Sequence, residues 1–205
     1  MYEHARRTEA GNENGNQRRK GRLCRGLHAA ADIFADDKAV TAMERIQRIF
    51  RHPLYREHFQ KLQEAEKDRI FCRHDLQHFL DVARISYIYD MEDGGNTPKA
   101  MIYAAALLHD IGRYTEIAQG RPHNEAGAEL AQIILADCGF ERRDIEAIAR
   151  AISGHRDSSH EAGREEDKLS RHIRRADKAA RCCFACGAAA ECKWSEEKKN
   201  HAISV

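Results

Sequence analysis

The sequence Ala104-Ala-Ala-Leu-Leu-His109-Asp110-Ile-Gly112 ends an apolar run abruptly in an imidazole and a carboxylate. Residues 100–108 are apolar all round, which predicts a central, buried helix. Burying two polar groups at the end of this helix costs free energy unless both are paired. The helix dipole favours a histidine at a C-terminus but disfavours a carboxylate there, so the pair indicates a bound cation rather than a simple helix cap.

Apolar residues elsewhere in the chain also recur at helical spacing. From Thr41 onward, Met43, Ile46, Ile49 and Phe50 follow steps of three and four residues, as on one face of a helix. Because the chain has only three prolines and no alternating, strand-like run, we expect an all-α bundle of about six helices. Besides residues 100–108 and the helix after Thr41, the predicted helices cover residues 74–89, 124–136, 143–152 and 169–181.

Composition divides the chain into three parts. Residues 1–38 contain a Gly/Asn-rich stretch and the basic run Arg18-Arg19-Lys20 but no apolar periodicity, which predicts a flexible N-terminal extension. Residues 39–181 are expected to form one domain, and residues 182–205 a cysteine-rich tail. A length of 205 residues suits a single domain with such extensions.

The charge of the chain is nearly balanced, with 34 Lys and Arg residues against 33 Asp and Glu residues. This balance does not require nucleic acid or an anionic membrane as a partner, and a nucleic-acid arm in the extension is the weaker alternative. No stretch reaches the roughly 18–20 apolar residues that span a bilayer. Since the seven cysteines are odd in number and no export signal is evident, we expect a cytoplasmic protein with reduced thiols.

Two further polar residues lie in apolar helical surroundings. His78 is flanked by Leu76 and Phe79, and Asp177 lies in the sequence Ile173-Arg-Arg-Ala-Asp-Lys. A lone histidine on an apolar face is more often a satisfied core residue than a ligand. The order in which these residues occur along the chain nevertheless favours the interpretation as ligands.

Taken together, these motifs resemble the HD superfamily of metal-dependent phosphohydrolases. The resemblance rests on His78-Phe-Leu-Asp-Val-Ala-Arg, then Leu-Leu-His109-Asp110-Ile-Gly, then Ala-Asp177-Lys, and it covers residues from about 67 to 181. The middle piece, His-Asp-Ile-Gly, is the form that gives many members their nickname. The resemblance implies a single all-α HD domain that hydrolyses a phosphate ester or anhydride with one or two divalent metal ions.

Two more histidines extend the resemblance. His123 in Pro-His-Asn-Glu-Ala-Gly and His155 in Ile-Ser-Gly-His-Arg are similar to the extra histidines of HD phosphodiesterases and of HD-type diadenosine tetraphosphate hydrolases. The alternative is that one is a loop histidine and the other a helix-end histidine. By resemblance, Asp110 would be shared by two ions, one held by His78, His109, Asp110 and Asp177 and the other by Asp110, His123 and His155.

The ligand types predict the chemistry but not the metal. Imidazole and carboxylate groups suit Mn, Fe, Co, Ni, Zn or Mg. Such an ion lowers the pKa of bound water from 15.7 to about 7, which predicts attack by a metal-bound hydroxide, with Asp110 in the catalytic centre. By resemblance, the substrate would be a small phosphorylated molecule, foremost a nucleotide or dinucleotide. We expect no membrane and no specific nucleic-acid partner, and leave a homo-oligomer open.

Basic and titratable residues near these ligands are candidates for contacts with the substrate. Arg113 and Lys178 occupy positions where the family often keeps a basic residue, and Arg156 directly follows His155. For each of the three, a solvated surface position is an equally good interpretation. His74 lies one helical turn before His78 and could donate a proton to the leaving group or orient a ligand.

Three alternatives stand beside this two-metal hydrolase. A mononuclear phosphomonoesterase would use only His78, His109, Asp110 and Asp177. A regulatory or nucleotide-binding module would bind metal without turnover. An HD-fold oxygenase with two irons would share the same ligands and is the least favoured.

The cysteine-rich tail carries a separate pattern. Cys183 and Cys186 have the Cys-x-x-Cys spacing of a zinc or iron–sulfur half-site, and Cys192 could supply a third thiolate. A histidine, His172 or His201, would then complete a structural metal site. Ordinary reduced thiols packed beside alanines, or a redox-sensing pair, are the alternatives.

Overall fold

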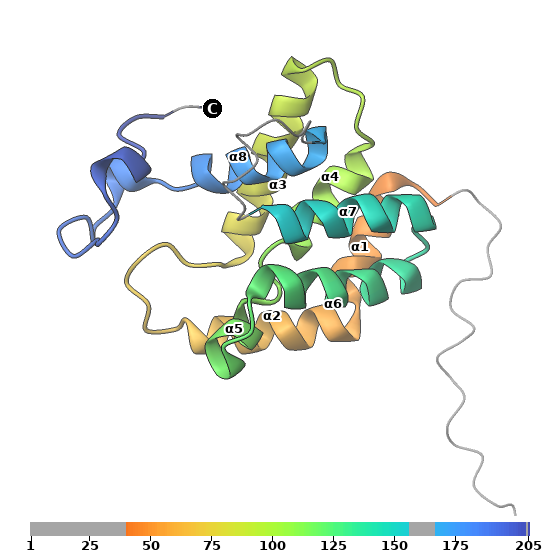
Figure 1. Cartoon of the computed structure of the whole chain (residues 1–205), viewed down its shortest axis with the longest axis horizontal. Coiled ribbons are helices and arrows are strands. Elements are labelled where there is room, and N and C mark those ends of the chain that lie inside the picture. The colour runs from red at the N-terminus through yellow and green to blue at the C-terminus, as the bar shows by residue number, and fades with distance from the viewer. Residues whose placement is uncertain (1–39, 156–166, 204) are drawn as a thin grey trace, which may run out of the picture. The chain divides into compact units, whose positions relative to one another are not determined.

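A computed structural model describes residues 40–155, 167–203 and 205 of the chain, and helices dominate this part (Figure 1). No strand occurs among these residues, which confirms the predicted all-α fold. The eight α-helices of the described residues are α1 (Ala42–Arg51), α2 (Pro53–Ala65), α3 (Leu76–Glu92), α4 (Lys99–Leu108), α5 (Arg113–Gln119), α6 (His123–Asp137), α7 (Arg142–Gly154) and α8 (Lys168–Ala179).

All six predicted helices are present, and α2 and α5 are additional. The helix α2 follows α1 after His52 alone, so the apolar pattern runs across the break that Pro53 introduces. The helix α5 has seven residues, too few for a periodic pattern to emerge. The predicted flexible extension, residues 1–38, lies outside the described residues.

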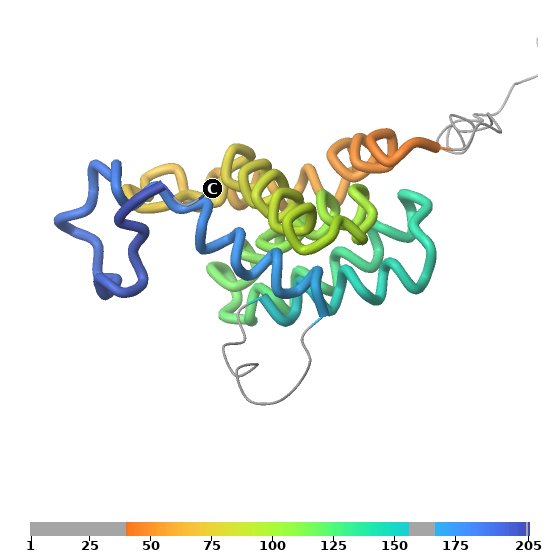
Figure 2. Tube along the Cα trace, turned by 90° about the horizontal axis from the view of Figure 1, so that it is seen from above, coloured from red at the N-terminus to blue at the C-terminus, as the bar shows by residue number. Residues whose placement is uncertain are grey.

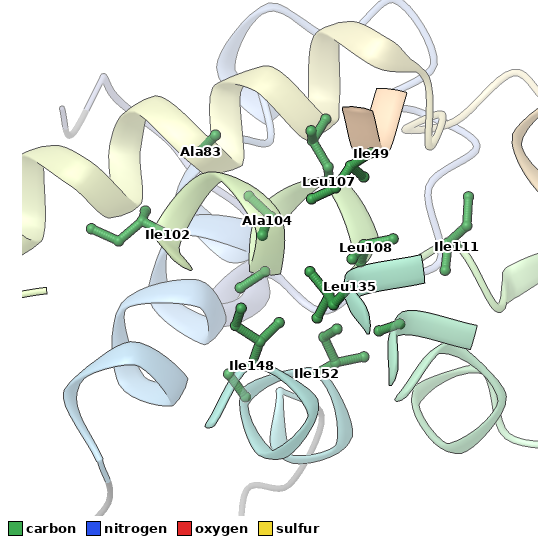
Figure 3. Packing of buried hydrophobic residues seen from close by; sticks show 14 of the residues in the cluster. Ile49, Ala83, Ile102, Ala104, Leu107, Leu108, Ile111, Leu135, Ile148 and Ile152 are labelled. Atoms are coloured by element: carbon green, nitrogen blue, oxygen red, sulfur yellow. The ribbon is translucent and has the colours of Figure 1, made fainter. Parts of the chain in front are cut away.

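The helix α4 forms the centre of the core, as its uniformly apolar sequence predicts. It packs against α1, α3, α6, α7 and α8. Figure 3 shows Leu107 beside Ile49 of α1, and Leu108 among side chains of α6 and α7. The residue that follows α4, His109, is fully buried. The central helix therefore delivers the His-Asp pair into the interior.

Side-chain caps set where the helices that carry candidate ligands begin. The Asp75 carboxylate accepts a hydrogen bond from the backbone N–H of His78 at 2.9 Å, which starts α3. Asp167 accepts from the N–H of Ser170 at 3.1 Å in the same way and starts α8. These caps position His78 in the first turn of α3 and Asp177 near the end of α8.

Gly112 lets the first turn of α6 approach the turn that follows α4. A Cβ atom at this position would lie 2.3 Å from the carbonyl oxygen of His123 and 2.5 Å from the backbone nitrogen of Gly127. No side chain fits between these backbone atoms. The glycine of the His-Asp-Ile-Gly motif thus brings His123 next to Asp110.

The chain after α8 forms a separate segment, residues 180–203, here called the C-terminal segment. It contains two short 3₁₀ helices, Cys183–Ala185 and Glu196–Lys198. The side-chain amide of Asn200 donates to the carbonyl oxygens of Lys178 and Arg181, which ties the segment to the end of α8. Figures 1 and 2 both show the segment (blue) at the same end of the domain as the loop between α2 and α3.

None of the helices in the described ranges is both long and apolar enough to cross a bilayer.

Candidate metal centre

Six side chains from five separate parts of the chain meet at the C-terminal end of α4. They come from α3, α6, α8, the turn after α4 and the end of α7. Their candidate ligand atoms form two groups, within each of which all atoms lie within 4.8 Å of one another. The first group is His78, His109, Asp110 and Asp177, and the second is Asp110, His123 and His155. Asp110 belongs to both.

The two oxygens of Asp110 face different groups. Its Oδ2 lies 3.3 Å from His109 Nε2 on the side of the first group. Its Oδ1 lies 3.0 Å from His123 Nε2 and 3.6 Å from His155 Nε2 on the side of the second. The first group is closed by Asp177, whose Oδ1 lies 3.4 Å from His78 Nε2. This carboxylate therefore has the geometry of a bridge between two ligand groups.

Acceptors behind the histidines turn their Nε2 atoms toward the centre. The Nδ1–H groups of His109 and His155 donate to the carbonyl oxygens of Ala106 and Ile152, at 2.7 and 2.6 Å. His123 Nδ1 lies 2.5 Å from the Glu116 carboxylate, which can only accept. Because Nδ1 carries the proton in each case, a neutral ring presents the Nε2 lone pair to the centre, as a metal ligand must.

The second group brings the lone pairs of two imidazole nitrogens and one carboxylate oxygen close together. His123 Nε2 and His155 Nε2 are 3.3 Å apart, and both face Asp110 Oδ1. With both Nδ1 atoms protonated, three lone pairs converge at one point, an arrangement that is favourable only around a cation. Consistent with this, Asp110 Oδ1 and His109 Nε2 are buried polar atoms without a hydrogen bond among the described residues. The residues present therefore fit divalent metal ions.

The charges of the centre show how strongly it attracts cations. Burial lowers the pKa of His109, but Asp110 and Asp177 outweigh burial and raise this pKa to about 10. Burial raises the pKa of Asp110, yet the neighbouring histidines, His109 foremost, hold it well below its usual range. The pKa of Asp177 is lowered as well, because His109 and His78 outweigh its burial. A divalent ion would take the place of the proton that these carboxylates hold on His109.

A family model described as the HD domain matches residues 75–182, which is more than half of the chain and includes all six of these side chains. The chain belongs to the HD domain family. This membership and the two groups of histidine and aspartate residues indicate a metal-dependent hydrolase.

Several proteins are similar to this HD domain. An uncharacterised protein of Clostridium beijerinckii is 37% identical over 161 residues, which are 78% of this chain and 99% of that protein. A bifunctional uridylyltransferase/uridylyl-removing enzyme of Rhodopseudomonas palustris is 41% identical over 59 residues, 28% of this chain and 6% of the enzyme. The crystal structure of a predicted HD superfamily hydrolase from an uncultured Thermotogales bacterium is 26% identical, with a TM-score of 0.48 over 75% of this chain and 86% of its own.

A cavity of about 890 Å³ opens onto the ligands of the HD domain. Its wall includes His74, Asp110 and Asp177 as well as residues of the C-terminal segment. The positive charge of the wall exceeds its negative charge, which comes from Asp110, Asp177 and Glu197. The basic residues of the wall are Arg69, Arg73, Arg113, Arg174, Lys178, Arg181, Lys193 and Lys198.

Three of the residues predicted to contact the substrate line this cavity: His74, Arg113 and Lys178. Arg113 Nη1 lies 3.5 Å from the Glu116 carboxylate that accepts from His123, so this guanidinium supports the second ligand group through Glu116. Arg156 lies outside the described residues.

Sequence reasoning missed two carboxylates that hold histidines in place. Glu66, which is 5% exposed, accepts from His74 twice, at 2.9 Å from the backbone N–H and at 2.7 Å from Nδ1. Glu116, in the short helix α5, accepts one hydrogen bond from His123, through Nδ1. Neither residue stands out in the sequence, because each lies seven or eight positions from its histidine in a stretch rich in charge.

The cysteines predicted to hold a structural metal do not meet as the histidines and aspartates do. Neither of the two ligand groups found among the described residues contains a cysteine. Cys183, Cys186 and Cys192 are free thiols of intermediate burial. His172, one predicted additional ligand, instead contacts Asp93 at 2.9 Å through Nε2, and His201 contacts the carbonyl oxygen of Glu196.

Proposed function

We propose that this HD domain hydrolyses a phosphate ester or anhydride of a nucleotide or dinucleotide with two divalent metal ions. The observation that carries the proposal is the Asp110 carboxylate, whose two oxygens face separate ligand groups below a basic cavity. The first group would hold one ion through His78, His109, Asp110 and Asp177, and the second another through Asp110, His123 and His155. Mn, Fe, Co, Ni, Zn and Mg all suit these ligands.

Divalent ions at these ligands would lower the pKa of water and neutralise charge on the phosphoryl oxygens. The chain's own residues would supply the remaining functions. His74 lines the cavity, with Nε2 3.4 Å from Asp110 Oδ2 and with Nδ1 on the Glu66 carboxylate. We assign to His74 the transfer of a proton to the leaving group, with Glu66 as the residue that positions it.

The cavity favours an anionic substrate larger than inorganic phosphate. A volume of about 890 Å³ lies in the range of about 300–1,000 Å³ typical of small-molecule sites. Lys178 projects into the cavity next to Asp177 and, within the described chain, forms no ion pair, so its ammonium group is available to phosphate oxygens. Trp194, also in the wall, offers an aromatic face on which a base could stack.

The test is phosphate release or phosphodiester cleavage by the purified full-length chain loaded with each candidate metal. The panel comprises nucleoside mono-, di- and triphosphates, dinucleoside polyphosphates, cyclic nucleotides and an aryl phosphate. We expect Asp110→Asn to lower kcat/KM by more than about 100-fold, beyond the 10–100-fold range of residues that support ligands. The matched control is Asp137→Asn, an exposed aspartate that pairs with His52 on the surface, and it should retain activity.

The result that would overturn the proposal is a metal-loaded chain that leaves the whole panel intact. Tight nucleotide binding without turnover would then favour the regulatory module. A single tightly held ion per chain, with full activity in His123→Ala, would favour the mononuclear phosphomonoesterase.

A further inference from the structure

The C-terminal segment has a defined course but almost no hydrophobic core of its own. From Arg181 to Ile203 no residue is buried, and Trp194 is 48% exposed. Its two 3₁₀ helices have three residues each. Chain segments that bury so little apolar surface usually need a disulfide or a metal to hold them. Disulfides do not provide this link, since the six cysteines of the described chain are free.

Cysteines are concentrated where the segment meets the body of the domain. Cys183 and Cys186 flank a 3₁₀ turn, in which the N–H of Cys186 donates to the carbonyl oxygen of Cys183 at 3.2 Å. Cys192 follows after five residues. Cys72 lies in the loop between α2 and α3, where Arg69 Nε donates to its carbonyl oxygen at 2.8 Å. This loop and the segment line the same cavity.

The two parts of the chain that carry these thiols line one cavity: its wall includes Cys72 from the loop, and Arg181 and Lys193, which lie two residues before Cys183 and directly after Cys192. The pKa of Cys72 is raised, first by burial and then by the charge of Cys183, with a smaller effect from Cys186. The pKa of Lys199 is raised chiefly by its hydrogen bond to Glu196, with smaller effects from the charges of Cys192 and Cys183. Together with the shared cavity, these effects indicate that Cys72 lies on the side of its loop that faces the segment.

We propose that Cys72, Cys183, Cys186 and Cys192 bind a structural zinc ion that fastens the C-terminal segment to the loop before α3. The Cys-x-x-Cys spacing of the central pair is typical of structural zinc sites, and four thiolates give the tetrahedral ligand set that zinc prefers. Each thiol that binds loses its proton to solvent. Cys72 supplies the fourth ligand, because the two histidines considered for this place, His172 of α8 and His201 of the segment, have other partners.

Binding requires the sulfur atoms to close in on one point. Zinc–sulfur bonds of about 2.3 Å place tetrahedral sulfur atoms about 3.8 Å apart, whereas no three of the sulfur atoms in the described chain lie within 4.8 Å of one another. All four side chains are partly exposed, and each sulfur turns about a single bond between staggered positions. The site would hold Arg181 and Trp194, whose guanidinium and ring lie 4.2 Å apart, at the wall of the cavity.

Two other cysteines provide matched controls. Cys182 is the immediate neighbour of Cys183, but its sulfur is directed to the carbonyl oxygen of Ala180 at 3.9 Å. Cys138 is buried in the core, and burial raises its pKa to about 11. The proposal therefore predicts four zinc-binding thiols and two thiols, in the described chain, that take no part.

The experiment is titration of the reduced full-length chain with Co²⁺ as a spectroscopic substitute for zinc. Thiolate ligands give an intense sulfur-to-cobalt charge-transfer band that histidine and aspartate ligands lack, so this site is observed separately from the HD centre. We expect the band in the wild-type chain and in Asp110→Asn, and its loss on addition of one equivalent of Zn²⁺. Cys72→Ser should weaken Co²⁺ binding by more than about 100-fold, whereas Cys182→Ser should not change it.

Absence of the band in the wild-type chain, or equal losses in Cys72→Ser and Cys182→Ser, would overturn the proposal. So would purification of the chain with an iron–sulfur cluster at these cysteines. A measurement on the wild-type chain avoids dependence on the folding of variants. Zinc should slow alkylation of Cys72, Cys183, Cys186 and Cys192 at least about tenfold, as mapped by mass spectrometry, and leave the rate at Cys182 unchanged. Equal rates with and without zinc would contradict the site.

Discussion

Asp110 shows how one residue can organise a whole site. Its carboxylate is 3% exposed, and its two oxygens face different sets of imidazole nitrogens. Each of these imidazoles is in turn held by an acceptor on the far side of the ring, either a carbonyl oxygen or a carboxylate. The centre therefore brings together lone pairs of imidazole nitrogens and carboxylate oxygens, which repel one another unless cations bind between them.

Replacement of Glu116 should impair the second ligand group alone. Glu116→Gln removes the carboxylate that fixes the tautomer of His123, so we expect metal affinity at this group to fall about 10–100-fold, and the first group to keep its ion. Metal counting after dialysis measures the two occupancies. Glu146→Gln, which alters an exposed carboxylate paired with Arg142, is the control. Loss of both ions in Glu116→Gln would contradict independent support of the second group.

At the level of the elements, the packing of α6 against the turn after α4 requires the two backbones to approach closely. Gly112 is the contact point, since the first turn of α6 leaves no room for a methyl group there. The same approach places His123, the first residue of α6, against Asp110. The packing of α6 against the turn after α4 therefore also assembles the second ligand group.

Gly112→Ala should therefore both destabilise the fold and separate the ligands. Because the atoms it would meet belong to the backbone, we expect a loss of at least about 3 kcal/mol in the free energy of unfolding, at the upper end for overpacked cores. Urea denaturation followed by circular dichroism measures this loss. Gly187→Ala is the control, because nothing lies within 4 Å of a Cβ at that position. Similar stability of the two variants would show that α6 moves away freely.

The HD domain as a whole is a bundle, within the described residues, whose helices converge on a centre of high charge density, so its stability should depend on metal. Ions that bind only the folded chain stabilise it by about 2.7 kcal/mol at a free concentration of 100 times Kd. We expect Tm to rise on addition of Mn²⁺ or Zn²⁺ and to fall with a chelator, as measured by calorimetry. In Asp110→Asn the rise should be largely lost. An equal rise in this variant would place the stabilising ion elsewhere.

The pH dependence of the metal-free protein follows from His109. Its pKa is raised from 6.5 to about 10 on folding, so the folded state binds this proton more tightly than the unfolded state does. The resulting stabilisation is fully present below pH 6.5 and is lost as the pH rises toward about 10. Urea midpoints measured with a chelator between pH 6.5 and 10 should fall, and His109→Gln should flatten this dependence. A midpoint that is constant with pH in the wild-type chain would refute the assignment.

The sequence by itself determined the all-α fold, the central helix and the order of the candidate ligands. These are local properties of the sequence. Apolar periodicity indicates the buried face of a helix. A polar residue that interrupts this face indicates a binding partner, because burying an unpaired polar group costs free energy. Only the tertiary structure decided which partners meet. It showed that the two oxygens of Asp110 face different groups, that Glu66 and Glu116 hold histidines, and that Cys72 and the C-terminal segment line the same cavity. Such contacts leave no periodic signal, because they join residues whose neighbours in the chain face other surroundings.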